Sequence, residues 1–129
     1  GGMPKYGNAN PSIISINGIE LKELPINSIE ILNKPIIFSG GGYFRLFPYF
    51  LIKMFTQKSN YVMSYFHPRD FDFHQPIAPG LSLARLFKSY VGIKNCDKKL
   101  INWLNDFDFI DLKDAVGQIN WDEVKKVEL

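Results

Sequence analysis

A chain of 129 residues is long enough for one domain, and a hydrophobic content of 46% is sufficient for a core. The formal net charge is only +2, with both signs interspersed, which excludes the basic block of a nucleic-acid-binding protein. The single cysteine, Cys96, excludes an internal disulfide or a cysteine-built zinc site, and it favours a reducing compartment. Because the sequence carries no secretory signal and no apolar run long enough to cross a bilayer, we expect a cytoplasmic protein without a membrane span.

The first part of the chain predicts an extended lead-in followed by a β-hairpin. Residues 1–12 are rich in Gly, Pro and Asn, which favours irregular structure. The apolar runs Ile13–Ile16 and Ile19–Leu21 flank Asn17-Gly18. This dipeptide favours a tight hairpin, because both of its residues readily adopt positive φ.

Several further segments predict strands because they are short, apolar and rich in β-branched or aromatic residues. They are residues 24–32, residues 36–38 after a turn at 33–35, residues 61–66 as a central strand, and residues 109–112.

Apolar residues at helical spacing predict helices over residues 46–57, with Pro48 in the first turn, and over residues 83–90. Asp97 is a predicted N-cap for a helix over 98–107, with the apolar residues Leu100, Ile101, Leu104 and Phe107 on one face. We expect another helical turn over 112–116 and a short helix in the tail, 121–129. Strands that alternate with helices from about residue 29 predict an α/β fold of four to six strands and about three helices.

Three consecutive glycines, Gly40–Gly42, stand between an apolar and an aromatic run. A phosphate loop is disfavoured, because no Lys-Ser/Thr pair follows and the fingerprint spacing is missing. The glycines indicate a place where the backbone passes close to another group. Arg45 follows at the predicted junction of strand and helix. Its guanidinium is suited to bind a carboxylate or phosphate, and the alternative is a surface arginine whose stem covers the neighbouring aromatics.

His67 ends the predicted central strand, and that edge is where α/β folds build ligand sites. A histidine there can exchange a proton near neutral pH, and the alternative is a histidine bonded to a backbone carbonyl beside a turn. His74 is interpreted as solvated, and its spacing from His67 matches no common metal site. Asp70 and Asp72 are interpreted first as solubilising residues.

Two motif segments resemble a subfamily of the polysaccharide deacetylases. Residues 38–49 are similar to its Gly-Gly-Gly-Tyr-Phe-Arg-x-x-Pro-Tyr signature, and residues 64–72 are similar to its Tyr-x-His-Pro-x-Glu-x-Asp motif. Other short matches follow in the expected order, and the similarity covers residues 4–117. They are Leu24–Ser28, Gln75-Pro76, Arg85–Gly92 and Asp106-Phe107.

The resemblance implies a distorted (β/α) barrel with its active site at the carboxyl ends of the strands. A divalent metal, usually zinc, held by an Asp and two His would activate water for attack on an N-acetyl group. The family's late histidine, which protonates the leaving amine, maps onto His67. The remaining site residues would contact substrate, and the glycine loop would line the sugar groove. These residues are Gly41, Gly42, Tyr43, Arg45, Tyr65 and Asp70.

The sequence departs from the family where the metal ligands are expected. The Thr-Phe-Asp-Asp and His-x-x-x-His motifs, which precede this region in the family, are absent. Asp70 replaces the usual Glu and Arg69 the usual Trp. The chain therefore resembles the C-terminal half of such an enzyme. We expect no metal in this chain and no deacetylase activity from it alone, with a zinc-like metal in a full-length parent.

The expected organisation is a lead-in over 1–12, a deacetylase-like region over 13–117 and a charged tail over 118–129. Its expected ligand is an N-acetylated polysaccharide or oligosaccharide. The alternative is a non-catalytic carbohydrate-binding or oligomerisation module derived from the same fold. Because half a barrel leaves a sheet edge and apolar surface uncovered, we expect a homo-oligomer or association with the missing N-terminal half.

Overall fold

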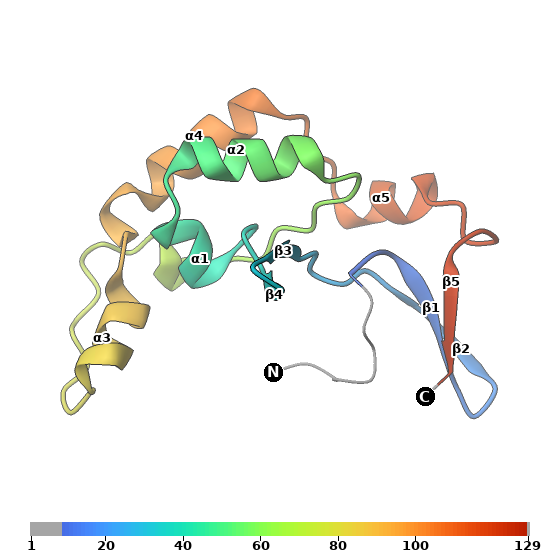
Figure 1. Ribbon diagram of the computed structural model, residues 1–129, viewed down its shortest axis with the longest axis horizontal. Helices are drawn as coiled ribbons and strands as arrows, with labels where there is room; N and C mark the ends of the chain where they lie inside the picture. Colours follow the sequence, from blue (N-terminus) through green and yellow to red (C-terminus); the bar gives the residue numbers. More distant parts are fainter. Residues whose placement is uncertain (1–8, 129) are drawn as a thin grey trace.

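The computed structural model describes residues 9–128 and shows a mixed α/β fold (Figure 1). The described strands form one three-stranded and one two-stranded sheet, and five α-helices accompany them. The α/β class is thus confirmed, while the described strands do not close into a barrel. Residues 1–8, most of the expected lead-in, lie outside the described part of the chain.

The N-terminal hairpin is confirmed. Strands β1 (Ser12–Ile16) and β2 (Ile19–Glu23) pair antiparallel, and the turn residues Asn17 and Gly18 have φ values of 50° and 80°. The predicted helix in the tail is wrong, because β5 (Lys125–Glu128) pairs parallel with the other edge of β1. The sheet order is therefore β2-β1-β5, and its last strand is recruited from the far end of the chain.

A second, two-stranded sheet replaces the longer strand predicted over residues 24–32. Strands β3 (Ile29–Ile31) and β4 (Lys34–Ile36) pair antiparallel around Leu32 and Asn33, which both have positive φ. The predicted turn at 33–35 is therefore displaced toward Leu32. Pro35 is tolerated in β4 because the strand lies at a sheet edge. Phe38 is buried as expected, although it follows the strand and is not part of it.

The core lies between short helices on the convex side of the molecule. Helices α1 (Gly41–Leu46) and α2 (Tyr49–Lys58) are separated by Phe47-Pro48, and α4 (Cys96–Asp106) lies beside α2 (Figure 1). Fully buried side chains of these helices form one cluster with Phe38, to which Phe66 and Phe109 add edge-on ring contacts. The cluster consists of Phe38, Phe44, Ile52, Cys96 and Trp103.

Helix α4 begins earlier than predicted, and its predicted core face is confirmed in part, because Leu100 and Phe107 pack against the core. Asn95 is its N-cap, and Asp97 lies in the first turn, where a carboxylate suits the helix dipole. Trp103 is fully buried, whereas Ile101 and Leu104, predicted for the core face, are exposed. The face is set by packing of the indole between Phe44 and Phe109.

The other helices follow the sequence more closely. Helix α3 (Leu83–Tyr90) has the predicted bounds, and Ser82 caps it by accepting a hydrogen bond from the Arg85 N–H. The helical turn expected at 112–116 is the longer helix α5 (Leu112–Gln118), and the strand predicted just before it is not formed. Two short 3₁₀ turns, η1 (Pro68–Asp70) and η2 (Ile93–Asn95), complete the described elements.

The predicted central strand over residues 61–66 is wrong, because only one parallel bridge, between Gly40 and Tyr65, forms there. Two side chains form hydrogen bonds with the backbone of Met63 in the middle of this segment instead. The Met63 N–H donates to Oδ1 of buried Asn27 at 3.3 Å, and the Met63 carbonyl accepts from the Ser39 hydroxyl at 2.8 Å. A β-rich composition therefore produces an extended segment without a continuous ladder.

The elements together form an arch (Figure 1). Helices α2 and α4 lie along its crest, the three-stranded sheet stands at one end, and α3 projects at the other end. None of the helices in residues 9–128 is long and apolar enough to cross a membrane.

Candidate functional site

Gly40 brings the two motif segments together. A Cβ atom placed on Gly40 would lie 2.0 Å from the carbonyl oxygen of Tyr65, a distance that no side chain can occupy. The Gly40 backbone is extended, with φ of −178°, so glycine is needed here for space and not for its φ value. The glycine run therefore marks a close backbone approach, as the sequence indicated, and the partner is the segment that ends in His67.

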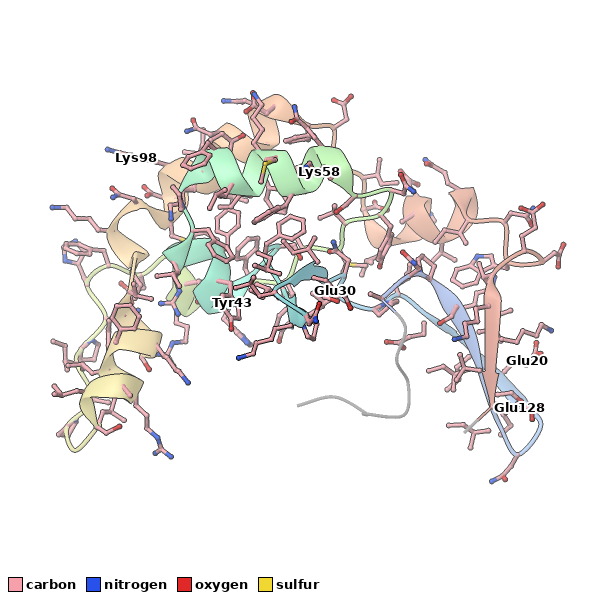
Figure 2. All side chains as sticks on the ribbon, in the orientation of Figure 1. Glu20, Glu30, Tyr43, Lys58, Lys98 and Glu128 are labelled. Atoms are coloured by element: carbon pink, nitrogen blue, oxygen red, sulfur yellow. The ribbon has the colours of Figure 1, made fainter. Side chains whose placement is uncertain are left out.

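The substrate loop expected from Gly40 to Arg45 is a helix. Gly41 and Gly42 form the first turn of α1, and Gly41 has a φ of 55°. This geometry places the half-exposed Tyr43 on the concave side of the arch (Figure 2). Tyr43 is therefore presented by a short helix whose start is fixed by the Gly40 bridge.

Two hollows flank Tyr43. The larger, of about 440 Å³, lies between α1 and α3, and its walls are mostly apolar. Its lining residues are Gly42, Tyr43, Leu46, Ala84, Phe87, Lys88 and Val91. The smaller hollow has a volume of about 230 Å³. It is lined by Ile26, Ile37, Gly40, Gly41, Tyr43 and Tyr65.

Tyr43, Tyr65 and His67 form an exposed aromatic strip along these hollows. Tyr65 lines the smaller hollow with Tyr43, and its ring meets the His67 ring edge-on at 4.9 Å between centroids. The His67 backbone N–H donates to Oδ2 of Asp70 at 3.0 Å, and its carbonyl accepts from the Asp70 N–H at 2.8 Å. The backbone of His67 is thus fixed while its ring remains exposed.

Arg45 and Asp70 are buried beneath this strip, with relative accessible surfaces of 6% and 4%. The Arg45 Nε lies 3.3 Å from Oδ1 of Asp70, at ion-pair distance but without hydrogen-bond geometry. Its Nη1 and Nη2 donate to the carbonyls of Ser89 and Lys88, at 2.6 and 3.1 Å. The interpretation of Arg45 as a surface residue is wrong. Its Nε pairs in charge with a carboxylate of its own chain while its two Nη atoms bond backbone carbonyls, and the side chain ties α1 to η1 and to the end of α3.

Lys99 is a structural residue that the sequence did not indicate. Its Nζ donates to the carbonyls of Arg45 and Phe47, at 2.6 and 2.7 Å, and to that of Phe44 at 3.3 Å. These are carbonyls that the short helix α1 leaves without intrahelical partners. Burial lowers the pKa of Lys99 below its ordinary value. The only sequence signal was a lysine in a helix turn, which is common on any surface.

Cys96 is fully buried in the core. Burial is the main cause that raises the pKa of its thiol to about 11, and nearby Asp70 adds to it. The thiol therefore stays protonated at neutral pH, which excludes it as a nucleophile and agrees with its interpretation as an inert residue.

Residues 9–128 contain no group of three or more His, Cys, Asp or Glu side chains arranged to hold a metal ion. Asp72 accepts a hydrogen bond from the His74 N–H at 3.0 Å, which orders the loop that follows η1. His74 is exposed, with its ring against Phe73.

The comparison with known families identifies the domain to which these features belong. A family model described as a domain of unknown function, DUF3473, matches residues 1–117. The chain belongs to this family. The matched part of the DUF3473 domain holds the Gly40 bridge, the aromatic strip and the Arg45–Asp70 pair, whereas β5 lies beyond it. Searches of curated proteins and of solved structures found no match.

Proposed function

We propose that this DUF3473 domain is the C-terminal part of a metal-dependent polysaccharide deacetylase that acts on N-acetylated sugars. The observation that carries the proposal is the adjacency of the two motif segments at Gly40 and Tyr65. Because of it, Tyr43, Tyr65 and His67 share one exposed surface next to two hollows.

Each exposed residue has a role in the proposed reaction. Tyr43 and Tyr65 offer amphipathic ring surfaces to sugar rings, and their hydroxyls can bond sugar hydroxyls. Gly41 and Gly42 leave the start of α1 open for close approach of a ligand. His67 donates a proton to the leaving amine as general acid.

Arg45 and Asp70 serve this proposal by positioning. Their charged groups are engaged with each other and with the carbonyls at the end of α3. They hold the helix of Tyr43 at a constant distance from the turn that carries His67. A direct contact with substrate would require the pair to open, and we assign them no such contact.

The metal and the catalytic base belong to a part of the enzyme outside this sequence. We expect the strands of this domain to complete a distorted (β/α) barrel with that part. A bound zinc ion would supply a hydroxide nucleophile at neutral pH. The described residues would orient the sugar and donate a proton to the leaving amine.

The test begins with the reading frame upstream of Gly1. Where it encodes Thr-Phe-Asp-Asp and His-x-x-x-His motifs, the whole enzyme is expressed, and acetate release from an N-acetylated oligosaccharide is measured. His67→Gln is expected to lower kcat by about 100-fold or more, the usual contribution of a general acid. The fall in rate on the alkaline side of the pH–rate profile, which reports loss of the proton from the general acid, should disappear with it.

His74→Gln is the matched control, because His74 is also exposed and lies on a neighbouring loop. It should leave kcat unchanged. Full activity of His67→Gln would contradict the assigned role. One tightly bound zinc and acetate release from the 129-residue chain alone would contradict the division of the site between two parts.

A carbohydrate-binding module without catalysis is the second candidate, and the exposed aromatic strip favours it. On this hypothesis the 129-residue chain alone binds an N-acetylated oligosaccharide, as measured by calorimetry. Tyr43→Ala and Tyr65→Ala should each weaken binding by about tenfold or more, since each removes the aromatic face against which the apolar side of a sugar ring would pack. Phe50→Ala, which removes an exposed aromatic from α2, is the control.

A further inference from the structure

The segment from Phe73 to Cys96 has an unusual charge balance. It contains three cationic residues and no Asp or Glu, although the whole chain carries 13 acidic residues and a net charge of only +2. The cations are Arg85, Lys88 and Lys94. This segment, which includes α3, is therefore a positively charged region on a nearly neutral protein.

Helix α3 contains no buried residue, although one side of it is apolar. Leu83 and Phe87 are four residues apart, so they lie on the same side of the helix, and Leu83 is 85% exposed. Tyr90, one turn further, lies on the same side. A helix in a soluble domain normally buries such a stripe against its neighbours.

Ile77 extends this apolar stripe. The Tyr90 hydroxyl donates to the carbonyl of Pro76 at 3.0 Å and accepts from the Ala78 N–H at 2.9 Å. These bonds hold Ile77, which is 68% exposed, beside the end of α3. The backbone on both sides of Ile77 is therefore hydrogen-bonded to Tyr90, which fixes the position of Ile77.

The charged residues of α3 lie away from the stripe. At 100° per residue, Arg85 is nearly opposite Leu83, and Lys88 lies between the two sides. In Figure 1, α3 and the loop before it project from one end of the arch, away from the crest of α2 and α4. Phe87 and Lys88 also line the hollow between α1 and α3, so a flat surface on this end would lie at the rim of that hollow.

We infer that this projecting end, with Ile77, Leu83 and Phe87 as its apolar contacts and Arg85 and Lys88 as its charges, docks on an anionic lipid bilayer surface. Apolar side chains enter the boundary between headgroups and acyl chains, while long cationic side chains reach anionic headgroups. The binding is peripheral, and it does not depend on the proposed deacetylase function.

A bilayer fits these observations better than an acidic protein. A protein partner needs a surface complementary in shape to a narrow, protruding helix, whereas lipids adapt to it. The segment between Asp72 and Asp97 carries no carboxylate, which limits the repulsion that an anionic surface would otherwise impose. Lys94 adds to this positive region, with its Nζ 5.8 Å from the centroid of the Phe73 ring.

The test is co-sedimentation of the 129-residue chain with lipid vesicles. We expect binding to vesicles with about 30% phosphatidylglycerol, weaker binding in high salt, and little binding to phosphatidylcholine alone. The double variant Leu83→Glu, Phe87→Glu should lower binding by about tenfold or more, because burial of either side chain is favourable by about 1.5–3 kcal/mol. Lys88→Gln should lower it by about fivefold, and Arg85→Gln, on the side of the helix away from the bilayer, should lower it less.

Leu32→Glu is the matched control, because Leu32 is 92% exposed in the turn between β3 and β4. It should bind vesicles as the unchanged chain does. A second measurement uses Leu83→Trp, whose added fluorescence should shift to shorter wavelength with anionic vesicles, whereas that of Leu32→Trp should not. Absence of binding to anionic vesicles, or equal binding by Leu83→Glu, Phe87→Glu and the unchanged chain, overturns the inference.

Discussion

Gly40 and Gly42 are two residues apart, yet they differ in what an added methyl group would meet. On Gly40 it would lie 2.0 Å from the Tyr65 carbonyl oxygen, and on Gly42 its nearest neighbours are 3.7 Å away. The first position requires the backbone to move, and the second allows ordinary contact. Glycine is therefore required at position 40, where no Cβ atom fits, and it is not required at position 42.

We predict that Gly40→Ala lowers the free energy of unfolding by about 2 kcal/mol or more, because two backbone segments must separate. Gly42→Ala is the control and should be neutral or raise stability by up to about 1 kcal/mol, since alanine loses less entropy in a helix. Urea denaturation of both variants measures the difference. Equal stability of the two variants would show that the Gly40 bridge does not constrain the fold.

The Arg45–Asp70 pair also acts at the scale of single residues. Asp70→Asn leaves a buried guanidinium without its counterion, and we expect a loss of about 3–5 kcal/mol of stability. The double variant Arg45→Met, Asp70→Leu removes both charges and should lose less than Asp70→Asn alone. Thermal denaturation compares them. A double variant less stable than Asp70→Asn would contradict this account of the pair.

At the scale of elements, helices α2 and α4 are joined by a polar clamp at one end. The Tyr49 hydroxyl donates a short hydrogen bond to the Asp106 carboxylate, and the Lys53 Nζ lies 2.9 Å from the same carboxylate. The hydrogen bond from Tyr49, and then Lys53, hold the pKa of Asp106 below its ordinary value of 3.8. Burial and the same contact raise the pKa of Tyr49, so the phenol stays protonated.

The clamp should make stability depend on acidity. A carboxyl group whose pKa is lower in the folded state stabilises the fold above its unfolded pKa, and this contribution is lost as the pH falls through the folded value. Asp106→Asn should therefore be less stable than the unchanged chain at neutral pH, and the two should converge below about pH 3.8. Asp108→Asn, exposed and two residues away, is the control. A difference that persists unchanged at low pH would exclude the ionised carboxylate as its source.

Elements that depend on local interactions were predicted well. The hairpin follows from Asn17-Gly18, and the bounds of α3 follow from Ser82 and the spacing of its apolar residues. Elements that depend on distant partners were not. Residues 61–66 have strand composition, but the side chains of Asn27 and Ser39 occupy the backbone hydrogen-bonding groups of Met63 in the middle of the segment. The tail forms a strand only because the free edge of β1 lies beside it.

At the scale of the whole molecule, the chain exposes more surface than its size requires. Its accessible surface is 9358 Å², and a compact monomer of 14.8 kDa exposes roughly 7,000 Å². The nine residues outside the described part account for at most about 1,400 Å² of the surplus. The remainder, roughly 1,000 Å², exceeds the area of about 800 Å² that each partner contributes to a standard interface.

Part of this surplus is one face of the three-stranded sheet. By register, all the aliphatic residues of the sheet except Ile13 lie on one face. The paired Glu20 and Lys126 lie on the other face together with the buried Ile13, and Figure 2 labels Glu20 there. The aliphatic face consists of Ile14, Ile16, Ile19, Leu21 and Val127. Ile16, Ile19 and Leu21 are exposed, so the face lacks a cover in the described chain.

We predict that the chain self-associates through this face, because the described residues leave it uncovered. Sedimentation equilibrium should give a mass above 14.8 kDa at high concentration. Ile19→Lys and Leu21→Lys should restore the monomer mass. Glu128→Lys, on the charged face of the same sheet, should not change it. A monomer at all concentrations would contradict the prediction.

The sequence by itself determined the α/β class, the hairpin, the existence of most helices and the two motif segments, because these depend on turn chemistry, periodicity and residue identity. Only the tertiary structure decided how the motifs meet. The contact of Gly40 with Tyr65, the burial of Arg45 against Asp70 and the pairing of β5 with β1 join residues 25 or more positions apart. Such contacts depend on the closure of long loops and on competition among partners, which no local pattern encodes.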